Sequence, residues 1–167
     1  MAHAGRDGQG AGGRTLAHLR QTSRDHARTP MQWSADAQGG FTTGTPWLAV
    51  NPNYAEINAA IQLENPDSVF HHHRRLIELR RQLPALVHGA FLDLDPEHQT
   101  VFVYTRTLGD ARLLVVIHFG REALAYVLPG GLAVGECVLD NVGLAAASAG
   151  STTLRLAPWQ ASVYRLA

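Results

Sequence analysis

The chain of 167 residues is predicted to adopt an α+β fold, with loop and helix in its first half and antiparallel strands in its second half. Two observations predict this. A helical hydrophobic pattern runs over residues 67–83, and after Gly89 the apolar residues alternate instead. Short strands with no helices between them are typical of an antiparallel β-sandwich. We therefore expect the chain to divide near residue 89.

The helix over residues 67–83 has recognisable start and stop signals. Asp67 or Ser68 can cap its first turn, and Pro84 disfavours the helical conformation at the residue before it. Arg74 and Glu78 can form an i,i+4 ion pair. The residues of the apolar stripe are Val69, Leu76 and Leu83, widened by Phe70 and Ile77.

Alternating apolar residues predict the strands of the second half. Turn-forming sequences at residues 108–110 and 129–131 separate some of them. The predicted strands are residues 90–94, 100–106, 112–119, 123–128, 136–140, 152–156 and 160–166.

The chain before residue 67 has weaker signals. We expect residues 1–13, which are rich in Gly, to be disordered, and residues 14–22 to form a short helix. Residues 24–66 are rich in turn formers and aromatic residues, with little regular structure expected. A loop of this length inside a compact domain is usually functional or part of something larger.

Composition excludes several classes of function. Fourteen basic residues balance fourteen acidic ones, so no nucleic-acid or anionic-membrane partner is indicated. All the basic residues are Arg, which removes lysine-based Schiff-base or P-loop chemistry. Cys137 is the single cysteine, and we expect an inert thiol there. No signal peptide or membrane-spanning run is visible, so a cytoplasmic location is the default expectation.

Two polar clusters on the predicted helix favour packing or solvated roles. Consecutive helical residues diverge by about 100°, so His71, His72 and His73 cannot converge on one metal ion. Four arginines form a basic helix face without an aromatic platform for nucleic acid: Arg74, Arg75, Arg80 and Arg81. No metal or cofactor is predicted.

The sequence RDHARTPMQW at residues 24–33 is the strongest candidate for a binding loop. Arg24 and Arg28 offer fixed forks of donors for hydroxyls, and Asp25 can accept from sugar-type hydroxyls. Trp33 and Trp47 offer flat apolar faces on which pyranose rings can stack. From the residues alone two interpretations stay open: a neutral polyhydroxy ligand, or a loop fixed to its own scaffold by Arg–Asp pairs and Trp residues.

Three longer blocks carry a resemblance to a known family. SRDHARTPMQW, then GGFTTGTPWLAVNPNY and EIN, and the helical DSVFHHHRRLIELRRQLPALVHGAF resemble the α-glucosidases of the α-amylase superfamily. The most similar types are oligo-1,6-glucosidases, trehalulose synthases and sucrose isomerases. The resemblance implies that residues 14–89 are the end of a (β/α)₈ barrel, with the loop after strand eight and the last helix. Residues 90–167 would be the C-terminal antiparallel β domain.

The resemblance also implies a catalytic mechanism whose residues are not all present in this chain. Members of the family are retaining glycosidases that use an Asp nucleophile in a GFRxD block, a Glu acid/base and an Asp in an NHD block. The 167 residues contain neither block. The resemblance implies that Arg24 binds the non-reducing-end glucose together with an Asp from an early barrel loop that is absent here. It also implies that Asp25 and Arg28 shape the loop that carries Arg24.

We therefore expect the C-terminal portion of an α-glucosidase that is inactive alone. Its substrates in the parent enzyme would be oligosaccharides or sucrose-like sugars, without a cofactor, nucleic acid or membrane. Two alternatives stay open: a non-catalytic β module that binds carbohydrate or a partner protein, and docking to a separately encoded barrel fragment.

Overall fold

The computed structural model describes residues 24–143 and 147–166. The disorder expected for residues 1–13 and the helix expected at 14–22 therefore lie outside the described residues. The chain separates into two compact units between His71 and His72, inside a helix, rather than at residue 89. Each unit is described by itself. The assignment of residues 14–89 to a barrel remnant and of 90–167 to a β domain stays a prediction.

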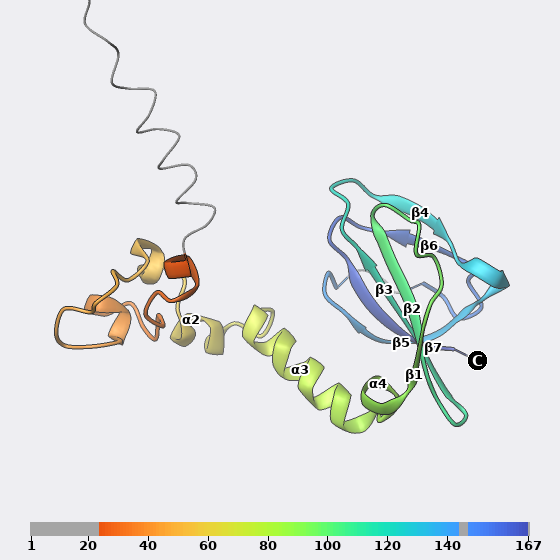
Figure 1. Ribbon diagram of the computed structural model, residues 1–167, viewed down its shortest axis with the longest axis horizontal. Coiled ribbons are helices and arrows are strands. Elements are labelled where there is room, and N and C mark those ends of the chain that lie inside the picture. Colours follow the sequence, from red (N-terminus) through yellow and green to blue (C-terminus); the bar gives the residue numbers. More distant parts are fainter. Residues whose placement is uncertain (1–23, 144–146, 167) are drawn as a thin grey trace, which may run out of the picture. The chain divides into compact units, whose positions relative to one another are not determined.

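The described part of the first unit consists of turns and short helices joined by loops (Figure 1). Its 3₁₀ turns are η1 (Arg24–Ala27), η2 (Ala37–Gly40) and η3 (Pro52–Ala55), and they are followed by helix α2 (Ala59–Glu64). The sequence did not predict α2. Asn58 explains it, because its buried side chain caps the helix: Oδ1 accepts from the Ile61 amide at 3.0 Å.

Helix α3 (Val69–Gln82) confirms the main helical prediction to within two residues. Ser68, not Asp67, is the residue whose side chain reaches the first turn, accepting from the His71 amide at 3.3 Å. The predicted ion pair between Arg74 and Glu78 forms at 3.2 Å. Both side chains are largely exposed, so the pair contributes little stability. No residue of α3 is buried.

All seven predicted strands are present in the second unit. They are β1 (Ala90–Asp93), β2 (Val101–Leu108), β3 (Ala111–His118), β4 (Leu124–Val127), β5 (Val134–Asp140), β6 (Thr153–Leu156) and β7 (Ala161–Leu166). A short helix that the sequence did not predict, α4 (Ala85–His88), precedes β1. It begins after Pro84, whose carbonyl accepts from the Val87 amide at 3.0 Å.

The strands form two sheets, and every pairing is antiparallel. The larger sheet has the order β1-β2-β3-β7-β5, and the smaller one pairs β4 with β6. The antiparallel prediction is therefore confirmed. The β5–β7 pairing shifts register on both sides of Cys137, so β5 is the irregular edge of the larger sheet.

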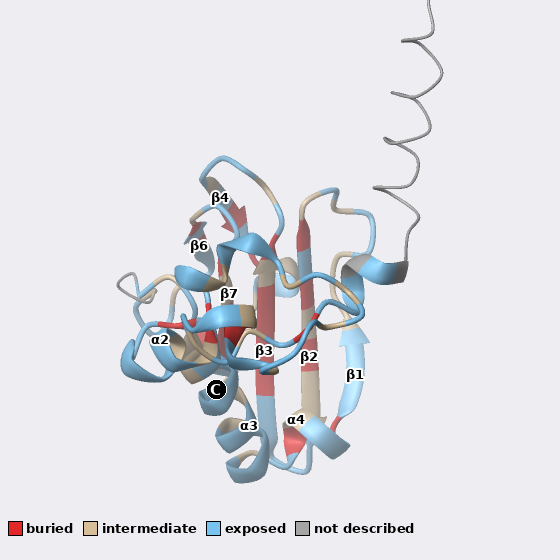
Figure 2. Cartoon of the chain, turned by 90° about the vertical axis from the view of Figure 1, so that its left-hand side faces the viewer, coloured by how far each residue is buried: buried red, intermediate tan, exposed pale blue. Residues whose placement is uncertain are grey.

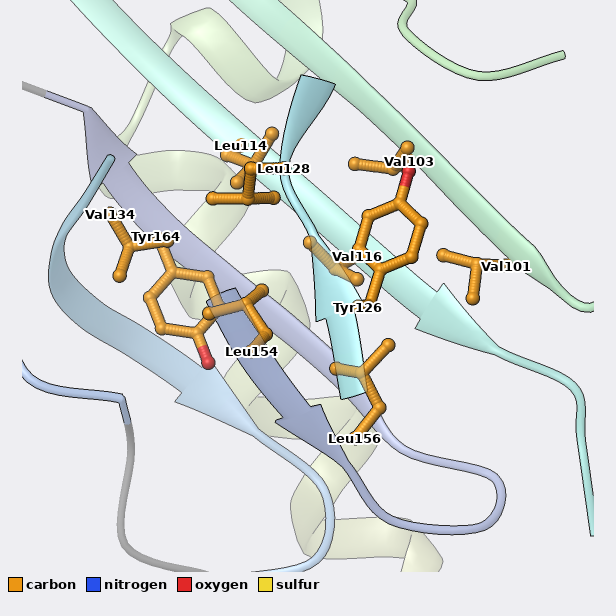
Figure 3. Close-up of a cluster of buried hydrophobic side chains, with 10 residues drawn as sticks. All are labelled: Val101, Val103, Leu114, Val116, Tyr126, Leu128, Val134, Leu154, Leu156 and Tyr164. Carbon is orange, nitrogen blue, oxygen red and sulfur yellow. The ribbon is translucent and has the colours of Figure 1, made fainter. Parts of the chain in front are cut away.

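One hydrophobic core lies between the two sheets (Figure 3). Strands β2 and β3 alternate toward it, so Val103, Leu114 and Val116 are fully buried. From the smaller sheet, Tyr126 and Leu154 face the same cluster. Burial of each such side chain stabilises the fold by roughly 1.5–3 kcal/mol relative to leaving it exposed. Figure 2 shows this burial concentrated in β2, β3 and β7, while α3 is exposed.

Candidate functional site

Gln32, near the end of the predicted binding loop at residues 24–33, connects it to residues 53–59. Its carbonyl accepts from the Ala59 amide at 2.9 Å. Its side-chain amide donates to Asn53 Oδ1 at 3.1 Å and to the Ile57 carbonyl. We call residues 24–58 the motif loop, and these bonds close its part from Gln32 onward at the base.

A tight backbone turn presents Trp33 at the surface. The Trp33 and Ser34 amides both donate to the Gly39 carbonyl, at 2.7 and 3.1 Å. Gly39 has a φ of +64°, and a Cβ there would lie 3.3 Å from Val50 Cγ1 and 3.4 Å from Gln32 Cα. Both the positive φ and the close contacts favour glycine at this position. Trp33 is left 54% exposed.

The three predicted sugar-binding residues lie at the start of the motif loop. Arg24 opens η1, and its side chain is outside the described part of the structure. Asp25 and Arg28 are exposed, and the Arg28 amide donates to the Asp25 carbonyl at 3.1 Å. Trp47 is 86% exposed. The backbone brings Asp25 and Arg28 together, whereas a sugar-binding role for any of these residues stays a prediction.

A groove of about 440 Å³ opens in the first unit beside the motif loop. Met31, Ile57 and Phe70 supply its apolar wall, and Gln32 and Asn58 supply polar groups. Asp25 and Arg28 are not among its lining residues. Sequence reasoning missed both polar residues. Asn58 could have been found as a cap before an apolar run, whereas nothing in the sequence around Gln32 marks its role.

The histidine and cysteine that the sequence offered as candidates take part in packing or hydrogen bonding within the chain. His71 Nε2 lies 2.9 Å from the Leu63 carbonyl, and its ring packs edge-on against Phe70 with centroids 5.1 Å apart. Cys137 lies half-buried in β5, where burial raises the pKa of its thiol. Burial also raises the pKa of the Tyr104 and Tyr164 hydroxyls. In residues 24–143 and 147–166, every buried side-chain nitrogen or oxygen has a hydrogen-bond partner.

None of the helices in the described residues is both long enough and apolar enough to cross a membrane.

Known proteins match the chain in sequence and in fold. Residues 6–89 match the family model of the α-amylase catalytic domain. The oligo-1,6-glucosidase of Halalkalibacterium halodurans is 43% identical over 153 residues, which are 89% of this chain and 27% of that protein. The trehalose-6-phosphate hydrolase of Bacillus subtilis is 37% identical over 99% of this chain and 30% of its own length.

Solved structures of similar enzymes also match this chain. An isomaltulose synthase variant from Erwinia rhapontici NX5, in complex with D-glucose, superposes with a TM-score of 0.89 at 47% identity. It covers 95% of this chain, and this chain covers 28% of it. The trehalulose synthase of Pseudomonas mesoacidophila MX-45 gives a TM-score of 0.90 at 42% identity over 96% of this chain and 29% of its own. This chain thus spans under a third of the relatives that it matches, and it belongs to the α-amylase family.

Proposed function

We propose that this chain forms the C-terminal part of a retaining α-glucosidase that acts on short α-glucosides in the cytoplasm. The observation that carries the proposal is the extent of the similarity. It runs through 95% of the chain at 47% identity to an enzyme structure that holds D-glucose, and curated relatives are oligo-1,6-glucosidases. Isomaltose-type oligosaccharides are the substrates that the oligo-1,6-glucosidases favour, and sucrose is favoured by an isomaltulose synthase structure that holds sucrose as its natural substrate.

In this proposal the motif loop forms one wall of a sugar pocket. Arg24 donates to hydroxyls of the non-reducing-end glucose, and Asp25 and Arg28 hold the shape of the loop start. Trp33 and Trp47 are exposed aromatic faces suited to pyranose rings. The hydrogen bonds at Gln32 support this role for the part of the loop that carries Trp33 and Trp47, because a pre-ordered loop loses less conformational entropy on binding.

Catalysis in this proposal depends on carboxylates from outside the chain. Retaining chemistry needs a nucleophile and an acid/base about 5–5.5 Å apart across the scissile bond. The GFRxD and NHD blocks that carry the two catalytic Asp residues in this family are missing from the 167 residues. We therefore expect no glucoside hydrolysis by this chain alone.

The first experiment incubates the purified chain with an aryl α-glucoside. The expected result is no turnover above a matched blank. Turnover that disappears in Asp25→Asn would contradict the proposed inactivity, because a group of this chain would then take part in catalysis.

The second experiment uses a hybrid enzyme. In it, this chain replaces the region of the H. halodurans oligo-1,6-glucosidase that it matches over 153 residues. We expect the hybrid to hydrolyse isomaltose, and Arg24→Ala to lower kcat/KM by about a hundredfold, the effect of losing a charged hydrogen bond. Arg155→Ala, at an exposed position of β6, is the control and should leave kcat/KM unchanged. Equal kcat/KM in all three proteins would refute the role of Arg24.

A non-catalytic β module that binds carbohydrate is the second candidate. The observation that favours it is Trp159, which is 56% exposed in a left-handed backbone conformation before β7. Calorimetry of the purified chain with maltose, isomaltose and sucrose separates the two candidates. Heat of binding that Trp159→Asn abolishes would favour the module, and no heat with any of the three sugars would count against it.

A further inference from the structure

Asn58 lies at the junction of the motif loop and helix α2, and it is only 3% exposed. Both polar atoms of its side chain bond to backbone. Oδ1 accepts from the Ile61 amide at 3.0 Å, and Nδ2 donates to the Tyr54 carbonyl at 2.9 Å. A buried amide that is bonded at both ends fixes the two segments that it joins.

The first turn of α2 binds the backbone that carries Trp33. The Ala59 amide donates to the Gln32 carbonyl at 2.9 Å, and the Ala60 amide donates to the Trp33 carbonyl at 3.0 Å. The first amides of a helix have no partners inside the helix. Here two carbonyls of the motif loop accept from the first two amides, and the Asn58 cap accepts from the third. The cap keeps the helix start formed, and the helix start holds the backbone at Trp33.

Asn58 also connects to the far side of the turn that presents Trp33. The Trp33 amide donates to the Gly39 carbonyl at 2.7 Å, which closes the turn. A Cβ added at Gly39 would lie 3.6 Å from Tyr54 Cβ, so the turn packs against the residue whose carbonyl Asn58 holds. One side chain therefore connects to both ends of the turn.

The turn needs this support because its backbone is strained. Gln38, Gly39 and Gly40 have φ values of +57°, +64° and +67° in succession. A positive φ is unfavourable for Gln38, which is not a glycine. Strained backbone persists only where the surroundings hold it, and it is common at ligand-binding sites. Trp33 is more than half exposed, so burial of its side chain contributes little of this support.

We propose that Asn58 is a positioning residue for sugar binding, which sets the place of Trp33 against the substrate by capping α2 and by holding Tyr54. This inference rests on the proposed function, because that function supplies the sugar. Asn58 acts through the Ala60 amide on one side and through the packing of Gly39 on the other. Without Asn58, the turn occupies its docked position in only a fraction of the molecules.

Positioning of this kind has its own kinetic signature, a raised KM with an unchanged kcat. If the sugar binds only the docked turn, the apparent affinity falls in proportion to the docked fraction. Bound substrate restores the docked state, so turnover of the complex keeps its rate. A role in stability alone has the opposite signature. It reduces the amount of folded enzyme, which lowers the apparent kcat and leaves KM unchanged.

The first test measures isomaltose hydrolysis by variants of the hybrid with the H. halodurans enzyme. Asn58→Ala should raise KM about fivefold, the effect of losing a helix cap, and leave kcat within about twofold. Asn58→Ser restores a capping oxygen and should recover most of the loss. An unchanged KM in Asn58→Ala would overturn the proposal. A KM in Asn58→Ser as high as in Asn58→Ala would also overturn it.

Asn65→Ala is the matched control for this series. Asn65 is an exposed asparagine at the other end of α2, where its Oδ1 accepts from the Asp67 amide at 2.9 Å. Its loss removes a bond of the same kind from the same helix but leaves the Ala59 and Ala60 amides in place. Both KM and kcat should stay at the values of the unsubstituted hybrid. A raised KM in Asn65→Ala would overturn the proposal, because any disturbance of α2 would then have the same effect.

The second test follows Trp33 in the free chain by fluorine NMR after labelling with fluorotryptophan. The chain has three tryptophans, so Trp33→Phe assigns the resonance of Trp33. Asn58→Ala should shift or broaden this resonance. Trp159 lies in the second unit, and its resonance should not change. An unchanged Trp33 resonance would overturn the proposal, and so would an equal change at Trp159, which indicates general unfolding.

The two tests separate this inference from the proposed function. A hybrid without glucosidase activity refutes the function, and the free chain then decides by itself whether Asn58 positions Trp33. An active hybrid whose KM does not respond to Asn58→Ala keeps the function and refutes the positioning role.

Discussion

The Tyr126 hydroxyl donates a hydrogen bond of 2.8 Å to Oδ2 of Asp95, which joins the smaller sheet to the turn between β1 and β2. Tyr126 is 4% exposed, and its ring packs edge-on against His98. Tyr126→Phe keeps the ring and removes the bond, so we expect a loss of about 1 kcal/mol in the free energy of unfolding. Urea denaturation measures this loss, and unchanged stability would show that the bond contributes nothing.

The same variant should change the dependence of stability on alkaline pH. Burial, and then the hydrogen bond to Asp95, raise the pKa of Tyr126 above its ordinary value of 10.0. Above pH 10 the unfolded chain therefore loses this proton while the folded chain keeps it, so stability falls as the pH rises. Tyr126→Phe should make this fall shallower. A residual slope is expected, because the pKa values of Tyr104 and Tyr164 are also raised.

Asp140 is the acceptor at the centre of a polar network at the end of β5. Its Oδ1 accepts from the Val142 and Gly143 amides at 2.8 and 3.0 Å. Its Oδ2 accepts from Gln160 Nε2 at 2.7 Å and from Ser162 Oγ at 2.6 Å. Asp140→Ala would remove all four of these hydrogen bonds at once, and we expect a loss of roughly 2–4 kcal/mol in urea denaturation.

Ser162→Ala is the matched comparison for this network. It removes one donor and leaves Asp140 bonded to the other three, so the expected loss is about 1 kcal/mol. Equal losses for Asp140→Ala and Ser162→Ala would mean that the carboxylate is not the centre of the network.

Gly89 lies where α4 meets the first strand pair. Its amide donates to the Ala85 carbonyl at 3.0 Å. A Cβ there would overlap the Ala85 carbonyl oxygen and lie 2.9 Å from the Thr107 amide nitrogen, both of which are backbone atoms. Gly89→Ala should therefore cost about 1–3 kcal/mol of stability by thermal or urea unfolding. Gly109→Asn is the control, since nothing lies within 4 Å of its Cβ and Asn tolerates its φ of +55°.

The alternation of apolar residues predicted the strands because the core against which these strands pack lies within this chain. In β2 and β3 the side chains alternate toward one core, so the pattern of Val101 and Val103 is visible in the sequence itself. Helices α2 and α4 were missed for a different reason. Each is stabilised by a cap or a proline start, at Asn58 and Pro84, rather than by an amphipathic stripe.

The candidate site was predictable only in part. The composition of residues 24–33 indicated a binding loop, because donors and aromatics gather there without helical or strand periodicity. The bonds that fix the motif loop were not predictable, since Gln32 and Asn53 are 21 residues apart in the sequence. Trp159 was missed because the sequence does not reveal a left-handed φ at a non-glycine residue.

Cys137 should behave as a protected thiol. Burial raises its pKa above the ordinary value of 9.0, and Sγ contacts the Leu139 carbonyl at 3.5 Å. Because the thiolate is the reactive form, alkylation by iodoacetamide at pH 8 should be at least about tenfold slower than for a cysteine peptide. Unfolding in urea should restore the peptide rate. Since the chain has one cysteine, all alkylation reports on Cys137 and no second variant is needed. An alkylation rate of the folded chain equal to that of the peptide would contradict the prediction.

The motif loop offers two neighbouring substitutions, of which only one is expected to disturb its order. Gln32→Ala removes both side-chain bonds that join the loop start to Asn53 and Ile57, so amide hydrogen exchange in residues 51–64 should become faster. Trp33→Ala keeps the backbone bond from Trp33 to Gly39 and removes a ring that is 54% exposed, so exchange there should be unchanged. Faster exchange in Trp33→Ala would show that the indole orders the loop and is not held ready for a ligand.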